Sequence, residues 1–167
     1  MTVPQLQSTP TLLRALTIAL TEQEAAWKPS PKRWSVLEVL GHLSHVEQLG
    51  FRHRIERMLA ENNPRIEPYD PEAYAAAGAF AGHSLASAVD AFQNQREQSL
   101  RLLENLPADA ASRTGVHGEF GPINIGNLLN EWPLHDLGHV RQIAELIRAV
   151  KYYPHIGPWQ KTYTMNP

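Results

Sequence analysis

Residues 128–150 read LLNEWPLHDLGHVRQIAELIRAV, and the spacing of the apolar residues predicts the inward face of an amphipathic helix. His135 and His139 fall on this face, which is marked by residues three or four apart: Leu128, Trp132, Gln142, Leu146 and Val150. Two histidines four apart on a helix lie about 40° apart and about 6 Å along its axis, so they can share one metal ion. Histidines that are hydrogen-bonded in a core need no metal, so this segment alone leaves both interpretations open.

This helix is predicted to begin near Asn124, a good N-cap residue, and to end near Val150. Pro133 lies inside it, two residues before the first of the two histidines. A proline within a helix removes one backbone hydrogen bond and usually causes a kink. The kink is either a local bend or a device that adjusts where His135 points.

A second helix is predicted to start after Ser35 and to reach about Ala60. Ser35 and Glu38 form a capping box, in which each side chain bonds the backbone amide of the other residue. With the start of the helix placed there, His42 shares a stripe with Val39, Val46 and Leu49 and is expected to face inward.

The remaining chain is predicted to supply two more helices, at residues 12–26 and 84–105. The long connection at residues 61–79 carries three prolines, so the second and third helices are expected to be parallel neighbours. Residues 108–122 are expected to form a polar loop or a short hairpin, and the aromatic segment 152–159 to fold back over the bundle. The fold class is therefore all-α: four helices with one long crossover, in a single domain of residues 1–167.

His42 is the natural third ligand for a metal held by His135 and His139. Three neutral imidazoles from two helices suit zinc, nickel, iron or copper and leave coordination positions open for water or substrate. His45 lies one turn after His42, so it is either a fourth ligand or a residue that flanks the pocket. At such an open site a metal can activate water or hold an incoming thiolate.

Several neighbours of the three histidines are candidates to orient them. Glu47 and Glu131 are expected to accept a hydrogen bond from an imidazole, whereas Asp136 is expected to be a solvated surface charge. Gln142 is expected to bond within the pocket or to satisfy a neighbouring helix backbone. The other histidines are expected to be exposed and the tryptophans other than Trp34 to be core or pocket-wall residues: His53, His83, His117 and His155, and Trp27, Trp132 and Trp159.

The composition narrows the class of protein. The chain has 167 residues, a formal net charge of −2 and no basic run, which argues against nucleic acid as a partner. The first residues do not have the pattern of a signal peptide and no apolar run approaches transmembrane length, so a cytoplasmic protein that does not bind membranes is expected. Cys is absent, so thiol chemistry would need a thiol brought by a second molecule.

Two stretches together resemble the DinB-like superfamily: Trp34-Ser-Val-Leu-Glu-Val-Leu-Gly-His-Leu-Ser-His-Val-Glu47 and His135-Asp-Leu-Gly-His-Val-Arg-Gln-Ile143. The resemblance implies a four-helix bundle of up-down-down-up topology, usually dimeric, with a divalent metal held by His42, His135 and His139. It also implies enzymes that use low-molecular-weight thiols, such as mycothiol-dependent isomerases and bacillithiol transferases. His45 departs from the family pattern, because many members have Asp at this position.

The leading hypothesis is a metal-dependent enzyme that transfers a thiol to a small electrophilic molecule or hydrolyses it with metal-activated water. The metal would be zinc, nickel or iron, with a low-molecular-weight thiol as a second cofactor in the transferase case. One alternative is a non-catalytic, dimeric, stress-related module that binds metal with a saturated coordination sphere. Another is a metal-free helical domain whose histidines are hydrogen-bonded core residues.

Overall fold

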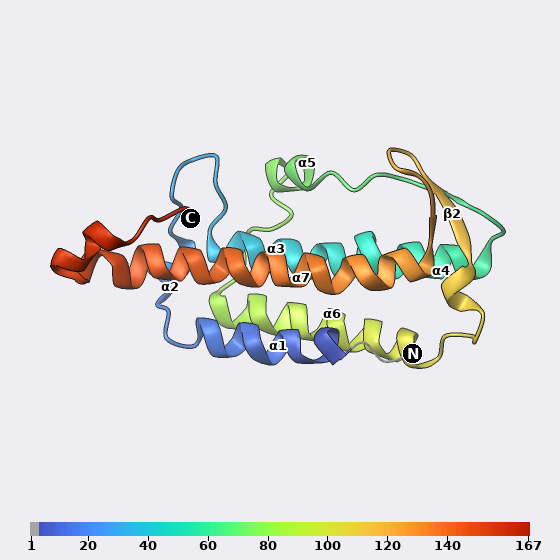
Figure 1. Ribbon diagram of the computed structural model, residues 1–167, viewed down its shortest axis with the longest axis horizontal. Helices are drawn as coiled ribbons and strands as arrows, with labels where there is room; N and C mark the ends of the chain where they lie inside the picture. The colour runs from blue at the N-terminus through green and yellow to red at the C-terminus, as the bar shows by residue number, and fades with distance from the viewer. Residues whose placement is uncertain (1–3) are drawn as a thin grey trace.

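The computed structural model describes residues 4–167 and is a bundle of long helical segments (Figure 1). The segments are α1 (Pro4–Thr17), the continuous run of α3 (Val36–Val46), η1 (Glu47–Arg52) and α4 (His53–Ala60), α6 (Leu85–Glu104) and α7 (Ile125–Ile147). In Figure 1, α1 and α7 run in one direction, and α3–α4 and α6 run in the other. The predicted four-helix bundle with up-down-down-up topology is confirmed, including the parallel packing of α3 against α6.

The first helix differs from the predicted range of 12–26. Helix α1 begins at Pro4 and continues through Pro10, and a separate short helix, α2 (Glu22–Ala26), starts at a capping box formed by Thr21 and Glu24. Pro10 has no N–H to donate to the carbonyl of Leu6. That carbonyl instead accepts a hydrogen bond of 2.8 Å from Nη1 of Arg96 on α6. A contact between helices thus satisfies the carbonyl that the proline leaves free.

The two helices that carry the histidines begin where the sequence predicts. The amide of Glu38 donates to the Ser35 hydroxyl at 3.2 Å, and the Ser35 amide donates to the Glu38 carboxylate at 2.8 Å. At the start of α7, Asn124 and Asn127 form the same reciprocal pair, with distances of 2.8 and 2.9 Å. These caps fix the phase of each helix, and hence the face on which its histidines lie.

The π-helical turn η1 interrupts the regular spacing of the second long segment. A π turn widens the helix and shifts the angular position of the residues that follow. Leu49, within this turn, is 37 % exposed, whereas Glu47, which continues the buried stripe of Leu40 and Leu43, is 1 % exposed. The prediction that Leu49 shares the inward stripe of His42 is therefore wrong.

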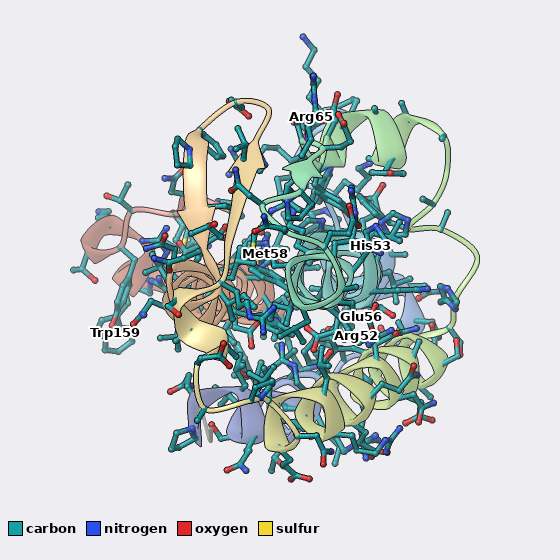
Figure 2. All side chains as sticks on the ribbon, turned by 90° about the vertical axis from the view of Figure 1, so that its right-hand side faces the viewer. Arg52, His53, Glu56, Met58, Arg65 and Trp159 are labelled. Carbon is teal, nitrogen blue, oxygen red and sulfur yellow. The ribbon has the colours of Figure 1, made fainter. Side chains whose placement is uncertain are left out.

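A small sheet packs beside one end of the bundle. The crossover contains β1 (Arg65–Ile66) and the short helix α5 (Pro71–Ala76), and the predicted hairpin is present as β2 (Thr114–His117) and β3 (Gly121–Asn124). The strand order is β1-β2-β3, with β1 parallel and β3 antiparallel to β2. Seen along the bundle, the hairpin stands to one side of the helices and Met58 lies between them (Figure 2). The sheet thus covers the part of the core around Met58 and Ile66.

The tail returns to the bundle only through its last residues, so the prediction that the segment 152–159 folds back over the bundle is wrong: Tyr152 is 55 % exposed and Trp159 is 66 % exposed (Figure 1). After α7 the chain continues through η3 (Arg148–Tyr152), η4 (Tyr153–His155) and η5 (Gly157–Thr162). The amide of Asn166 then donates to the Glu145 carboxylate at 3.1 Å, and Arg33 donates to the Pro167 carbonyl at 2.6 Å. Within residues 4–167, no helix has both the length and the apolar character needed to cross a bilayer.

Candidate metal centre

His42 on α3 and His135 and His139 on α7 meet inside the bundle. One nitrogen from each ring lies within 4.8 Å of the others, and the two Nε2 atoms of His42 and His135 are 3.2 Å apart. A tetrahedral zinc ion with zinc–nitrogen distances of about 2.0–2.1 Å places two ligand nitrogens about 3.3 Å from each other. The three imidazoles therefore have a spacing that fits a single metal ion.

Of the three rings, only that of His139 is hydrogen-bonded, among residues 4–167, to a residue outside the group of three, whereas His42 and His135 bond to each other through Nε2. Nδ1 of His139 lies 2.8 Å from the Gln142 side-chain oxygen, so Nδ1 donates and Nε2 carries the free lone pair. Nδ1 of His42 and Nδ1 of His135 are buried and have no hydrogen-bond partner in the described part of the chain. Of the two roles predicted for Gln142, the structure supports the bond within the pocket. A metal bound by the three rings would hold His42 and His135 as well as His139.

Burial keeps these histidines neutral, which is the form that binds metal. Desolvation, followed by the proximity of His139, His135 and His45, lowers the pKa of His42 to about 2. Desolvation, with smaller contributions from His139 and Arg96, lowers the pKa of His135 to about 3. The pKa of His139 is also lowered by burial, against the opposing effect of its bond to Gln142. The lone pairs are thus available at neutral pH.

These lowered pKa values predict that the metal-free protein loses stability as the pH falls below about 6.5. The unfolded chain takes up protons on His42 and His135 there, whereas the folded protein does so only near pH 2 to 3. The free energy of unfolding should therefore fall by up to about 1.4 kcal/mol per pH unit for each of the two residues. Urea denaturation at pH 7.5, 6.5 and 5.5 measures this slope. His135→Asn should reduce the slope, and His53→Gln, at an exposed position, should not. An unchanged slope in His135→Asn would contradict the prediction that His135 contributes to the loss of stability.

A buried ionic network lies next to the histidines. Arg96 of α6 donates to both carboxylate oxygens of Glu47, at 2.6 and 2.9 Å, and to both of Asp136, at 2.8 and 3.0 Å. All three side chains are at most 1 % exposed. The indole N–H of Trp132 also donates to Glu47, at 2.9 Å. The network joins η1, α6 and α7 behind the segment of α7 that carries His135.

The structure corrects the prediction for Asp136 and adds Arg96, which sequence reasoning missed. Asp136 was expected at the surface because it projects about 100° from His135, but α7 is covered by helices on more than one side, so both positions are enclosed. Arg96 falls on the buried stripe of α6, between Phe92 and Leu103. An arginine on an apolar stripe is the signal that could have indicated a buried partner. Burial disfavours the charged form of Arg96, but the neighbouring Glu47 and Asp136 raise the pKa of Arg96 above its ordinary value.

The other candidates lie outside the group of three. His45 is hydrogen-bonded through Nδ1 to the Tyr69 hydroxyl at 2.8 Å and contacts Tyr74, with the rings tilted by 58° and their centroids 4.4 Å apart. It flanks the site, and the group with metal-ligand spacing does not include it. Glu131 is exposed and does not bond to any of the three imidazoles. Glu47 does not bond to them either, because its carboxylate accepts hydrogen bonds from Arg96 and Trp132.

The expectations for the outlying aromatic residues are partly wrong. His117 is only 3 % exposed, and its Nδ1 accepts hydrogen bonds from the amides of Glu119 and Phe120 in the hairpin turn. Trp159 is 66 % exposed on the tail, so it is neither a core nor a pocket-wall residue. Trp132, in contrast, is fully buried, stacked on Phe51 with ring centroids 4.7 Å apart.

An open cavity of about 860 Å³ is lined by two of the three histidines, His135 and His139. Trp34 forms one wall and lies nearly parallel to the ring of His139, with a centroid distance of 6.5 Å. Phe80 covers His42 from the crossover, and Gly41 makes this possible because a Cβ atom there would lie 2.7 Å from the Phe80 carbonyl oxygen. The cavity is lined by Lys32, Arg33, Trp34, Glu72, His135, Gly138, His139, Arg141, Gln142, Glu145, Asn166 and Pro167. Its volume is suitable for a small-molecule ligand.

Comparison with known proteins places this bundle in a family. The DinB superfamily model matches residues 5–143, so the chain belongs to the DinB superfamily. The resemblance noted in the two helices that carry the histidines is thereby confirmed. The matched range includes all three histidines and the buried ionic network.

Two relatives have names that describe a reaction class. The chain is 23 % identical over 146 residues to "Putative metal-dependent hydrolase OB0782" of Oceanobacillus iheyensis, covering 87 % of this chain and 84 % of that protein. It is 26 % identical over 151 residues to "Putative metal-dependent hydrolase BH0277" of Halalkalibacterium halodurans, covering 90 % and 87 %. The structure of YfiT from Bacillus subtilis, described as "a probable metal-dependent hydrolase with an unusual four-helix bundle topology", superposes with a TM-score of 0.78 at 22 % identity. That match covers 87 % of this chain and 83 % of YfiT, and supports the fold.

Proposed function

We propose that this protein is a metal-dependent enzyme acting on a small electrophilic molecule, with His42, His135 and His139 as the ligands of one divalent metal. The observation that carries the proposal is that three neutral imidazoles converge beside an open cavity, which His135 and His139 line. The spacing of their nitrogens fits a metal, and in the described part of the chain no fourth His, Cys, Asp or Glu joins the group. An incomplete set of protein ligands is typical of catalytic sites, whereas structural zinc sites usually have four.

Hydrolysis is the reaction that the comparisons favour, because both relatives are named for it. A divalent metal in such a site acts as a Lewis acid and activates water near neutral pH. Gln142 holds His139 in the tautomer that presents Nε2, and Trp34 and Phe80 shield the ligands from bulk solvent. Transfer of a low-molecular-weight thiol is the second reaction of the proposal. It is compatible with the absence of Cys from the chain, because the thiol would come from the co-substrate.

The proposal predicts that hydrolysis depends on metal. Protein loaded with zinc, nickel or iron should hydrolyse members of a panel of small esters and amides, and a chelator should reduce the rate to background. Restoring the metal should restore the rate. A parallel panel of thiols and electrophiles, followed by mass spectrometry of the adducts, tests the transferase reaction. A protein that binds metal without an exchangeable water and is inactive in both panels would support the non-catalytic module instead.

We also propose a homodimer that uses the outer face of α7. Leu134 is 72 % exposed and Leu137 is 46 % exposed on this face, which is unusual for adjacent large apolar side chains. Sedimentation velocity should give about twice the chain mass of 18.7 kDa. The variant Leu134→Glu should shift the protein toward the monomer. Wild-type protein that sediments at the mass of one chain would rule the dimer out.

A further inference from the structure

Basic side chains surround the mouth of the cavity that His135 and His139 line. Lys32 and Arg33 come from the segment before α3, and Arg141 comes from α7, one turn after Gly138. All three are exposed at the cavity rim. Long cationic side chains are common on protein surfaces. They indicate a binding site for an anionic ligand only where the protein itself does not already pair their charges.

The charges at the rim are only partly neutralised by the protein. Arg33 donates to the carbonyl oxygen of Pro167 at 2.6 Å. Lys32 and Arg141 have no hydrogen-bond or ion-pair acceptor among residues 4–167. Their donors are therefore free to bind a ligand.

Acidic groups do not cancel this excess of positive charge. Of the two acidic side chains that line the cavity, Glu145 already bonds to Arg148 and to the amide of Asn166. Glu72 is the other, so the lining has three cationic side chains and one acidic side chain that is not already paired. The histidines are neutral and contribute no negative charge. A cavity with an excess of charges of one sign in its lining attracts ligands of the opposite sign.

The part of α7 between the histidines and the basic rim has no side chain at Gly138. Gly138 lies on α7 between His135 and Arg141, and a Cβ atom built there meets nothing within 4 Å. An extended molecule can therefore pass along α7, beside Trp34, from the rim to the histidines. The cavity volume of about 860 Å³ leaves room for a molecule that reaches both ends.

We infer that the substrate is a small molecule with a carboxylate or phosphate group, which Arg141 and Lys32 bind at the rim while its reactive group lies at His42, His135 and His139. This inference rests on the proposed function, because it takes the histidines as the reactive end of the site. Arg141 is the principal residue, since a planar guanidinium can bind both oxygens of a carboxylate or phosphate. Lys32 adds a second positive charge from the segment before α3.

Calorimetric titration of the zinc-loaded protein with alkyl hydroxamates tests the inference without using activity. A hydroxamate group binds zinc, and chains of two to six carbons can end in a methyl, a carboxylate or a phosphonate. For at least one chain length, the acidic compounds should bind about tenfold more tightly than the methyl compound. Comparison of carboxylate with phosphonate shows which acid the rim prefers.

Variants separate the rim from the zinc site. In Arg141→Gln combined with Lys32→Gln the gain from the acidic group should disappear, while binding of the methyl compounds should not change. Arg101→Gln, at an exposed position on α6 that does not line the cavity, is the control and should retain the gain. Equal binding of acidic and methyl compounds by the wild-type protein at every chain length would overturn the inference.

Failure of the metal site gives a different result from failure of the rim. If no hydroxamate binds, the proposed metal function fails, and titration of the metal-free protein with glutarate and with inorganic phosphate then decides the inference. Weaker binding of either anion by the double variant than by the Arg101→Gln control supports the basic rim. Equal binding by the two variants, or no binding by the wild-type protein, overturns it.

Discussion

Replacing Arg96 with Met is expected to lower the free energy of unfolding by about 3–5 kcal/mol, a large part of the stability of a domain of this size. The reason is the burial of Glu47 and Asp136, each 1 % exposed. Without the guanidinium, two carboxylates would remain in the core with no cation to balance them. The carbonyl of Leu6, which Pro10 cannot satisfy, would lose its donor as well. Urea denaturation of the purified variant measures the effect.

Two further variants distinguish the loss of charge from the loss of packing. Arg101→Met makes the same substitution at an exposed position of α6, where a change within about 0.5 kcal/mol is expected. Arg96→Met combined with Glu47→Gln and Asp136→Asn removes all the charges of the network and should recover part of the lost stability. Two results would contradict this account: a loss of less than about 1 kcal/mol in Arg96→Met, or a triple variant that is no more stable than the single one. Either would show that the stability does not depend on the ion pairs of Arg96 with Glu47 and Asp136.

The variant His139→Ala is expected to lose the metal almost completely. The purified wild-type protein should contain about one divalent metal per chain, and the variant should bind it at least about a hundredfold more weakly, since removal of an outer-shell partner alone costs tenfold to a hundredfold. Elemental analysis and competition with a chromogenic chelator measure occupancy and affinity. Metal removal should also lower the melting temperature of the wild-type protein, because metal binds only the folded state.

Matched variants test the assignment of each neighbour. His45→Ala should retain the metal, because His45 bonds to Tyr69 and lies outside the group of three. Gln142→Ala should weaken binding about tenfold to a hundredfold, because it removes the acceptor that orients His139. Full retention of metal in His139→Ala would refute the three-histidine site. A wild-type protein without metal, whose melting temperature does not respond to chelator, would support the metal-free helical domain.

Local sequence signals predicted the helices that carry the candidate site. The Ser35–Glu38 capping box set the phase of α3, so the position of His42 relative to Val39 and Val46 could be interpreted correctly. His135 and His139 followed from a regular stripe on α7, which has a cap of its own. These predictions needed only helical periodicity and the hydrogen bonds of one turn.

The errors arose where one part of the chain depends on a distant part. Leu49 was misplaced because a π turn changes the phase of the helix at residues 47–52. Glu47 was assigned to an imidazole because its partner Arg96 lies on another helix. The start of α1 was misplaced because Arg96 also satisfies the carbonyl left free by Pro10. Periodicity within one helix carries no information on such tertiary bonds.

The buried network also has a consequence for the charge balance of the candidate metal centre. Two carboxylates and one guanidinium leave a single net negative charge fixed behind α7, next to a site whose proposed ligands are all uncharged. A divalent cation at that site would be partly balanced by this charge across the helix, without a carboxylate entering its coordination sphere. The positions facing the cavity would then be left to solvent and substrate. Charge compensation and coordination of the proposed metal would thus be divided between different residues.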